Sequence, residues 1–121
     1  MMNKFQELYF KIQAWDGFSV KHDLNTYEGG GFAVGGASEC HEIKVDDLSW
    51  NRFADIVADL CALTRGKASR LLIGGWVDDH GRAYLELSDI VQNRAEAIAL
   101  GKDRDEKAIY DLWNNEEIKL K

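Results

Sequence analysis

The chain has 121 residues, of which 45% are hydrophobic and 30% charged, and its formal net charge at pH 7 is −6. This length and composition predict one globular domain over residues 1–121 and exclude a disordered chain. An acidic chain lacks the counterion-release term that favours phosphate backbones, so direct nucleic-acid binding is not expected. No long apolar run is present, and charge appears early at the N-terminus. We therefore expect no membrane span, no secretory leader and a location in the cytoplasm.

The first segment, residues 5–15, has a pattern that fits two structures. Phe5, Leu8 and Ile12 follow a helical spacing, whereas Leu8, Phe10 and Ile12 alternate as they would in a strand. The aromatic content favours a strand, or a short helix that leads into one.

Three short strands are predicted next, at residues 18–21, 32–34 and 40–45. Glycines surround the second of them and invite comparison with a phosphate-binding loop. However, the spacing of a GxGxxG or GK[ST] motif is absent, and no helix follows directly to face a phosphate. We expect these glycines to form turns.

The clearest helix covers residues 49–64. Its apolar side chains recur at three- and four-residue steps, as on a helix face buried against a sheet: Trp50, Phe53, Ile56, Val57, Leu60 and Leu63. Ser49, or Asp47 just before it, is expected to cap the first amides, and Gly66 to end the helix.

Residues 71–88 predict a central hairpin whose turn contains Asp78, Asp79, His80 and Gly81. Two registers fit this turn. A loop of two or four residues places Trp76 on the same face as Leu85 and Leu87, whereas a three-residue loop with a bulged Gly81 sets Trp76 opposite Tyr84.

Gly74 and Gly75 stand in the interior of the first hairpin strand, where glycine lowers stability. They indicate either a bulge or a tightly packed side chain above them, or the close approach of another backbone or of a ligand.

The last third of the chain predicts a helix and two strands. Asn93 and Glu96 have the spacing of a capping box, and residues 108–112 and 118–120 alternate as strands. The whole pattern predicts an α+β fold with a mostly antiparallel sheet of about five to seven strands and two helices packed on one face. The expected element order is β-β-β-β-α-β-β-α-β-β.

No arrangement of residues compels one chemistry. Cys40, His41 and Glu42 are adjacent on a predicted strand and point to alternate sides, so they do not indicate a shared metal. Asp78, Asp79 and His80 could orient a general base on an exposed tip, yet the same residue types are selected by hairpin turns. We therefore predict no catalytic residue, no metal site and no cofactor.

The acidic charge is concentrated in residues 1–60, which contain five Lys and Arg but ten Asp and Glu. Such a surface could bind a basic protein, including one that normally holds nucleic acid. The side chains predicted to contact a partner are Glu39, Glu42, Asp46, Asp47, Asp78, Asp79 and His80.

Six short stretches carry a resemblance to a known group: residues 17–20, 31–34, 74–78, 84–88, 108–112 and 117–118. Over residues 17–118 the chain resembles small, mostly uncharacterised proteins of bacteriophages and prophages, especially those of actinobacteria. It departs from that pattern at Glu86, where Asp is more frequent, and at Lys107, where Gln is usual. The resemblance implies a phage-encoded accessory protein and carries over no catalytic residue.

Small acidic proteins in that setting are often inhibitors of host defence. The leading expectation is a non-enzymatic inhibitor, such as an anti-CRISPR or anti-restriction factor, that contacts a host protein or protein–nucleic acid complex. The alternatives are a small enzyme that acts on a nucleotide-like ligand through Asp78, Asp79 and His80, and a structural or assembly protein of a virion.

Overall fold

The computed structural model describes residues 2–65 and 71–121, which form an α+β fold with one antiparallel sheet. The helices are α1 (Lys4–Gln13), α2 (Trp50–Leu63) and α3 (Arg94–Asp103), and a short 3-10 helix, η1, covers Val45–Asp47. The strands are β1 (Phe18–Val20), β2 (Phe32–Val34), β3 (His41–Lys44), β4 (Leu71–Val77), β5 (Arg82–Val91), β6 (Ala108–Asp111) and β7 (Glu116–Lys119). No helix within the described residues is long and apolar enough to cross a membrane.

The sheet is organised around β5, which is ten residues long. One edge of β5 pairs with β4, and β1 pairs with the far side of β4. The other edge pairs first with β3, from Arg82 to Leu85, and later with β2, from Asp89 to Val91. Strands β6 and β7 continue the sheet beyond β2.

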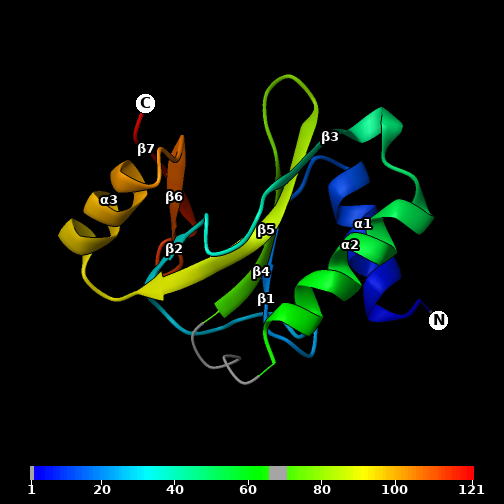
Figure 1. Cartoon of the computed structure of the whole chain (residues 1–121), viewed down its shortest axis with the longest axis horizontal. Coiled ribbons are helices and arrows are strands. Elements are labelled where there is room, and N and C mark those ends of the chain that lie inside the picture. The colour runs from blue at the N-terminus through cyan, green and yellow to red at the C-terminus, as the bar shows by residue number, and fades with distance from the viewer. Residues whose placement is uncertain (1, 66–70) are drawn as a thin grey trace.

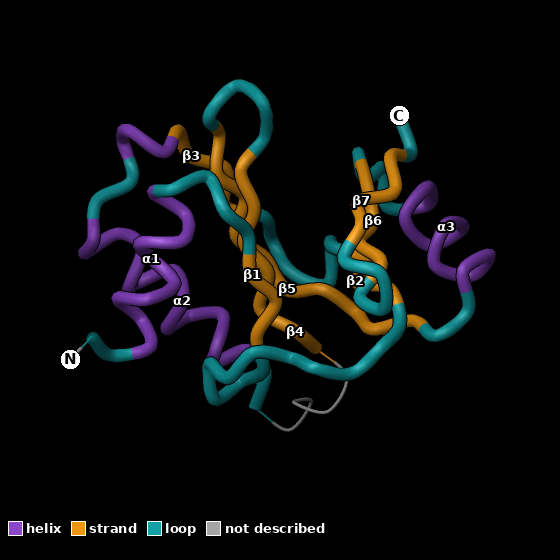
Figure 2. The backbone as a smooth tube through the Cα atoms, turned by 180° about the vertical axis from the view of Figure 1, so that it is seen from behind, coloured by secondary structure: helices purple, strands orange, loops and turns teal. Residues whose placement is uncertain are grey.

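The three helices pack on the same face of this sheet. Leu85 and Leu87 of β5 belong to the core under α1 and α2, whereas Val91 of β5 packs into a second core under α3. Side chains two or four positions apart on a strand share a face, so both cores lie on one side of β5. The sheet curls between them, with α1 and α2 at one end and α3 at the other (Figures 1 and 2).

The first element is a helix that leads into β1, which is the second of the two alternatives, and the strand that opened the expected element order was wrong. Asn3 accepts a hydrogen bond from the Gln6 amide while the Gln6 side chain accepts from the Asn3 amide, which completes a capping box. Leu8 and Ile12, one turn apart, are buried against the core. Of the aromatic side chains that favoured a strand, Phe5 and Tyr9 are partly buried at the edge of the core and Phe10 is exposed.

The element order therefore begins with a helix, and three α-helices cover the sheet face instead of two. The other predicted elements are confirmed with shifts of a few residues at their ends. Ser49 caps α2 by accepting from the Arg52 amide at 3.1 Å, and Asn93 caps α3 by accepting from Glu96 at 3.0 Å. Gly66, predicted to end α2, lies outside the described residues.

The central hairpin adopts the three-residue loop of the two predicted registers. Trp76 lies opposite Tyr84, and pairing runs without a bulge from Leu71 to Val77. Gly81 has φ +78, a conformation that glycine adopts without steric cost. The Asp78 amide also donates to the Arg82 carbonyl at 3.0 Å, which closes the loop.

Candidate functional site

The sheet face opposite the helices borders a cavity of about 520 Å³. This volume is in the usual range for small-molecule sites. Strands β4 and β5 form the floor through side chains that point away from α1 and α2. The side chains with polar or aromatic chemistry that line the cavity include Cys40, Trp76, Tyr84, Glu86, Glu106 and Lys107.

The two strand glycines have different surroundings. A side chain at Gly75 would come within 2.6 Å of the Phe18 ring and 3.0 Å of Leu85, so Gly75 is required by packing on the helix side. At Gly74 an added Cβ would meet nothing closer than the Ser88 Oγ at 3.6 Å. Gly74 thus leaves the cavity floor open.

Glu86 stands on this floor, directly opposite Gly74. Only 7% of its surface is exposed, which is rare for a carboxylate. Among the described residues it forms no ion pair with a lysine or arginine. Burying the charged form of a carboxyl group without a cation costs free energy, so ionised Glu86 lowers the stability of the fold.

Glu106 approaches Glu86 from the end of α3. The helix ends with Asp105 in the left-handed conformation, at φ +58, and the Glu106 amide donates to the Gly101 carbonyl at 2.9 Å. This is a Schellman motif, which directs the chain after α3 towards the sheet. An added Cβ at Gly35 would overlap the Oε1 atoms of both Glu86 and Glu106, so the two carboxyl groups are neighbours.

Burial, and then the negative charge of Glu106, raises the pKa of Glu86 to about 7 from the ordinary value near 4.5. Hydrogen bonds from the Cys40 thiol and the Gly36 amide lower the pKa of Glu86, but they do not offset the effects of burial and of Glu106. The negative charge of Glu106 beside it disfavours ionisation of Glu86. Near neutral pH Glu86 therefore exchanges a proton readily.

Cys40 enters the cavity because of the way β5 is paired. Between β3 and β2 the edge of β5 has no strand partner, and the loop of residues 35–40 passes there, with the Ala37 amide donating to the Leu87 carbonyl at 3.2 Å. Partial burial, followed by the charge of Glu86, raises the pKa of the Cys40 thiol to about 12. The thiol is therefore a poor nucleophile at neutral pH.

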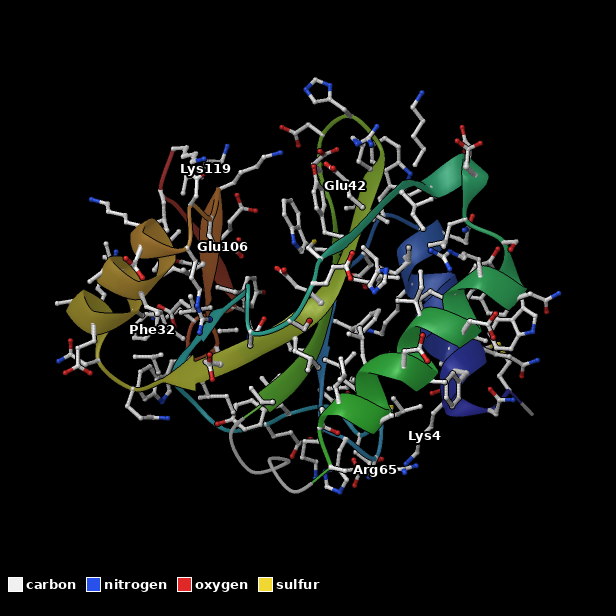
Figure 3. The ribbon with its side chains drawn as sticks, in the orientation of Figure 1. Lys4, Phe32, Glu42, Arg65, Glu106 and Lys119 are labelled. Atoms are coloured by element: carbon white, nitrogen blue, oxygen red, sulfur yellow. The ribbon has the colours of Figure 1, made fainter. Side chains whose placement is uncertain are left out.

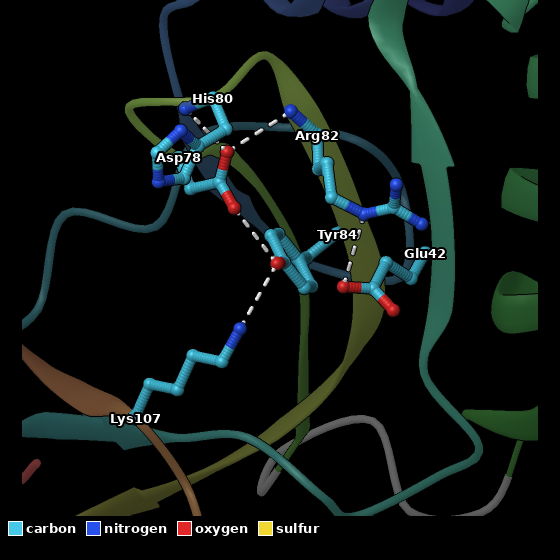
Figure 4. A network of polar contacts seen from close by, with 6 residues as sticks. All are labelled: Glu42, Asp78, His80, Arg82, Tyr84 and Lys107. Atoms are coloured by element: carbon cyan, nitrogen blue, oxygen red, sulfur yellow. Dashed lines mark hydrogen bonds and ion pairs between the residues drawn. The ribbon is translucent and has the colours of Figure 1, made fainter.

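The hairpin supplies an aromatic wall. The Trp76 and Tyr84 rings stack with their centroids 4.3 Å apart and their planes 12° apart. The Tyr84 hydroxyl donates to Asp78 Oδ2 at 2.9 Å, and Lys107 Nζ donates to the same hydroxyl at 3.2 Å (Figure 4). These contacts hold both rings in place beside the cavity.

No family model, curated protein or solved structure matches the chain. The phage resemblance and the function that it implies therefore remain predictions.

Most of the residues predicted to bind a partner lie around the hairpin turn. The Val45 amide donates to the Gly81 carbonyl at 2.8 Å, which brings η1 beside the turn. We call this region the acidic end: Glu42, Asp46, Asp47, Asp78, Asp79 and His80. Glu39 is exposed but precedes β3, whose other end reaches the turn.

Positively charged side chains neutralise only part of the negative charge of the acidic end. Arg82 Nε lies 3.3 Å from Glu42 Oε1, and Lys44 is exposed on the same strand as Glu42. The nearby Tyr84 hydroxyl and the charge of Arg82 lower the pKa of Glu42, and burial opposes them without cancelling their effect. Asp46, Asp47 and Asp79 are exposed and have no ion pair among the described residues.

Asp78 is used by the turn itself. Its Oδ1 accepts from the amides of His80 at 2.9 Å and Arg82 at 3.0 Å, while Oδ2 accepts from Tyr84. Burial acts to raise the pKa of Asp78, but these hydrogen bonds outweigh it and hold that pKa below the ordinary value. Both oxygens are occupied, so Asp78 is a structural acceptor.

We expect Asp78→Ala to lower the free energy of unfolding by about 1–3 kcal/mol, because three donors lose a charged acceptor. Urea denaturation of the purified variant measures this change. Asp79→Ala is the matched control, since Asp79 is exposed and makes no side-chain hydrogen bond among the described residues. Equal effects of the two substitutions would contradict the structural role of Asp78.

Trp15 is a surface feature that sequence reasoning did not single out. It occupies the residue after the C-cap of α1 with φ +61, where a Schellman motif normally takes glycine. Its ring lies over the hairpin turn, because a Cβ added at Gly81 would meet Trp15 Cζ2 at 2.9 Å. The side chain is nevertheless 54% exposed.

Within the described residues, no group of three His, Cys, Asp or Glu side chains is arranged to hold a metal ion. Glu42 and Glu106 lie on different parts of the sheet, one beside the hairpin and the other beside β6 (Figure 3). The chemistry available in the cavity is therefore that of a carboxyl pair, a protonated thiol and an aromatic wall.

Proposed function

We propose that this chain is a non-enzymatic binding protein that blocks a basic, nucleic-acid-handling protein or complex of a host cell. The acidic end would occupy the partner's positively charged surface. In the phage setting that the resemblance implies, the protein would be an inhibitor of host defence of the anti-CRISPR or anti-restriction type.

The observation that carries this proposal is Trp15 beside the acidic end. A bulky residue in the left-handed conformation costs about 1 kcal/mol or more, and such strain tends to persist where function requires it. Exposed tryptophan is the side chain most enriched among the residues that dominate binding energy at protein interfaces. Acidic neighbours would supply the complementary charge that steers a basic partner.

The two alternatives receive less support. An enzyme that uses the hairpin turn would need a carboxylate held beside His80. Both Asp78 oxygens already accept hydrogen bonds from the turn, and Asp79 is exposed with no side-chain hydrogen bond among the described residues to orient it. A virion assembly role predicts large symmetric oligomers, which light scattering of the purified protein would detect.

The test is capture from a bacterial lysate with wild-type protein and with the triple variant Asp46→Lys, Asp47→Lys, Asp79→Lys. We expect the wild type to retain a basic protein that nucleic acid displaces, and the variant to bind it at least about tenfold more weakly at low salt. Trp15→Ala should weaken binding by about 2 kcal/mol, because an aromatic side chain that the partner would bury is lost.

A matched control reverses the same amount of charge on the α3 side of the molecule, at the exposed residues Glu96, Asp103 and Glu116. Its affinity for the captured protein should stay within about twofold of the wild type when salt is high enough to screen distant charges. If both triple variants lose binding equally, net charge and not the acidic end is responsible. The proposal is rejected if no basic protein is captured.

A further inference from the structure

The cavity on the helix-free face contains a charge that the proposed function does not use. Glu86 is 93% buried, since only 7% of its surface is exposed, and it lines the cavity without a lysine or arginine partner among the described residues. Glu86 has hydrogen-bonding neighbours in the Cys40 thiol, the Gly36 amide and the Glu106 carboxyl group, but none of them carries a positive charge. A cation to balance the two carboxyl groups would therefore come from outside the chain.

The geometry around Glu86 suits one positively charged group. Gly35 has no side chain, and the Oε1 atoms of Glu86 and Glu106 occupy the space beside it. Gly74 leaves the floor in front of Glu86 open, with no atom within 3.6 Å of an added Cβ. A ligand can thus reach both carboxyl groups from the same side.

The aromatic wall favours an organic cation. Trp76 and Tyr84 present stacked rings at the cavity, and such rings attract cations and cover the alkyl part of a ligand. Lys107 Nζ of this chain already lies 5.2 Å from the centroid of the Tyr84 ring, so Trp76 is the ring left for a ligand. An inorganic divalent ion would require more oxygen or sulfur ligands than the cavity offers, because no three such side chains converge within the described residues. An anion would be repelled by two carboxyl groups.

We propose that this cavity binds an organic cation, an alkylammonium or alkylguanidinium group, between Glu86 and Glu106 with its carbon chain against Trp76. Charged donors form the strongest hydrogen bonds to carboxylates, and guanidinium can bridge two of them. The site does not include the acidic end, so a test of this site is independent of the proposed protein partner.

The experiment follows the amide shifts of ¹⁵N-labelled protein during titration with n-butylguanidinium, with n-butylurea as the neutral isostere. We expect butylguanidinium to shift the amides of residues 74–76, 84–88 and 106–107, and butylurea to leave them unchanged. Glu86→Gln and Glu106→Gln should each weaken binding by about tenfold or more, because a charged hydrogen bond is worth at least about 1.4 kcal/mol.

Two further variants separate binding from folding. The Gly74→Val variant should fold as the wild type does, and its new side chain should fill the space on the cavity floor. It should therefore abolish binding of butylguanidinium without removing a charge. Glu96→Gln, on the exposed start of α3, removes one charge outside the cavity and should bind as the wild type does. Circular dichroism of each variant confirms that the fold is retained.

The cation could be a free amine or a basic side chain of another protein. An acetylated and amidated pentapeptide with a central arginine distinguishes these sources: shifts at the same amides assign a side-chain ligand, and shifts with butylguanidinium alone assign a small molecule. Either result supports the site. Equal binding of butylurea and butylguanidinium, or the absence of shifts in the wild type, overturns it.

Discussion

Gly75→Val should lower the free energy of unfolding by about 2–3 kcal/mol or more. The new side chain would meet the Phe18 ring at 2.6 Å and Leu85 at 3.0 Å. Phe18 cannot move away freely, because its ring packs edge-on against the fully buried Phe53 of α2. Relief of the overlap would therefore shift β1 or α2 as a whole.

The same substitution at Gly74 provides the control. Its added Cβ meets no atom within 3.6 Å, and valine is favoured in strands. We expect Gly74→Val to change the free energy of unfolding by no more than about 0.5 kcal/mol. Urea denaturation measures the difference in stability between the two variants: the midpoints are compared once both unfolding free energies are shown to depend equally on urea concentration. Similar midpoints would mean that the two faces of β4 are packed alike, contrary to the structure.

Glu86→Gln should stabilise the protein at alkaline pH and leave its stability unchanged in acid. The pKa of Glu86 is raised to about 7 in the folded state, from a value near 4.5 in the absence of burial. The folded protein thus binds the proton more tightly than the unfolded chain. Stability from this carboxyl group is present below pH 4.5 and is lost as the pH rises to about 7.

The magnitude follows from the size of the shift. Each pKa unit corresponds to about 1.4 kcal/mol, so the difference between wild type and Glu86→Gln should reach about 2–3 kcal/mol at pH 8. The groups that face Glu86 are Glu106, Cys40 and the Gly36 amide. Denaturation of both proteins from pH 4 to pH 8 measures the effect. A constant difference across this range would show that Glu86 does not change its charge in the cavity.

These two results also bear on the cavity as a site. An ionisable group that lowers the stability of the fold is typical of a site in which stability is given up for binding. Saturation with butylguanidinium should therefore raise the stability of the wild type at pH 8, by mass action on the folded state.

Several elements were predictable because their signals are local. The stripe from Phe53 to Leu60 and the Ser49 cap define α2 without reference to the rest of the chain. The capping box of α1 was equally local, in Asn3 and Gln6, but the aromatic content of the segment concealed it. The alternatives for the hairpin loop could not be decided, because both satisfy the turn residues.

The cavity could not be predicted for a specific reason. Tyr84, Glu86 and Ser88 alternate with Ala83, Leu85 and Leu87, so they appear in the sequence as the solvent face of a half-buried strand. The curl of the sheet turns that polar face inward, and α3 then delivers Glu106 from twenty residues away. Each of these three polar side chains is less than 9% exposed.

The sequence by itself determined the class of the fold, most of its strands, the long covering helix and the acidic balance of the first half. These follow from periodicity, capping and composition, which act within a few residues. The tertiary structure alone decided that Glu86 and Glu106 meet beside Gly35, that Trp15 lies on the hairpin turn, and that Gly74 opens a floor while Gly75 closes a core. Those outcomes depend on contacts between segments far apart in the chain, and on which face of the sheet curls inward.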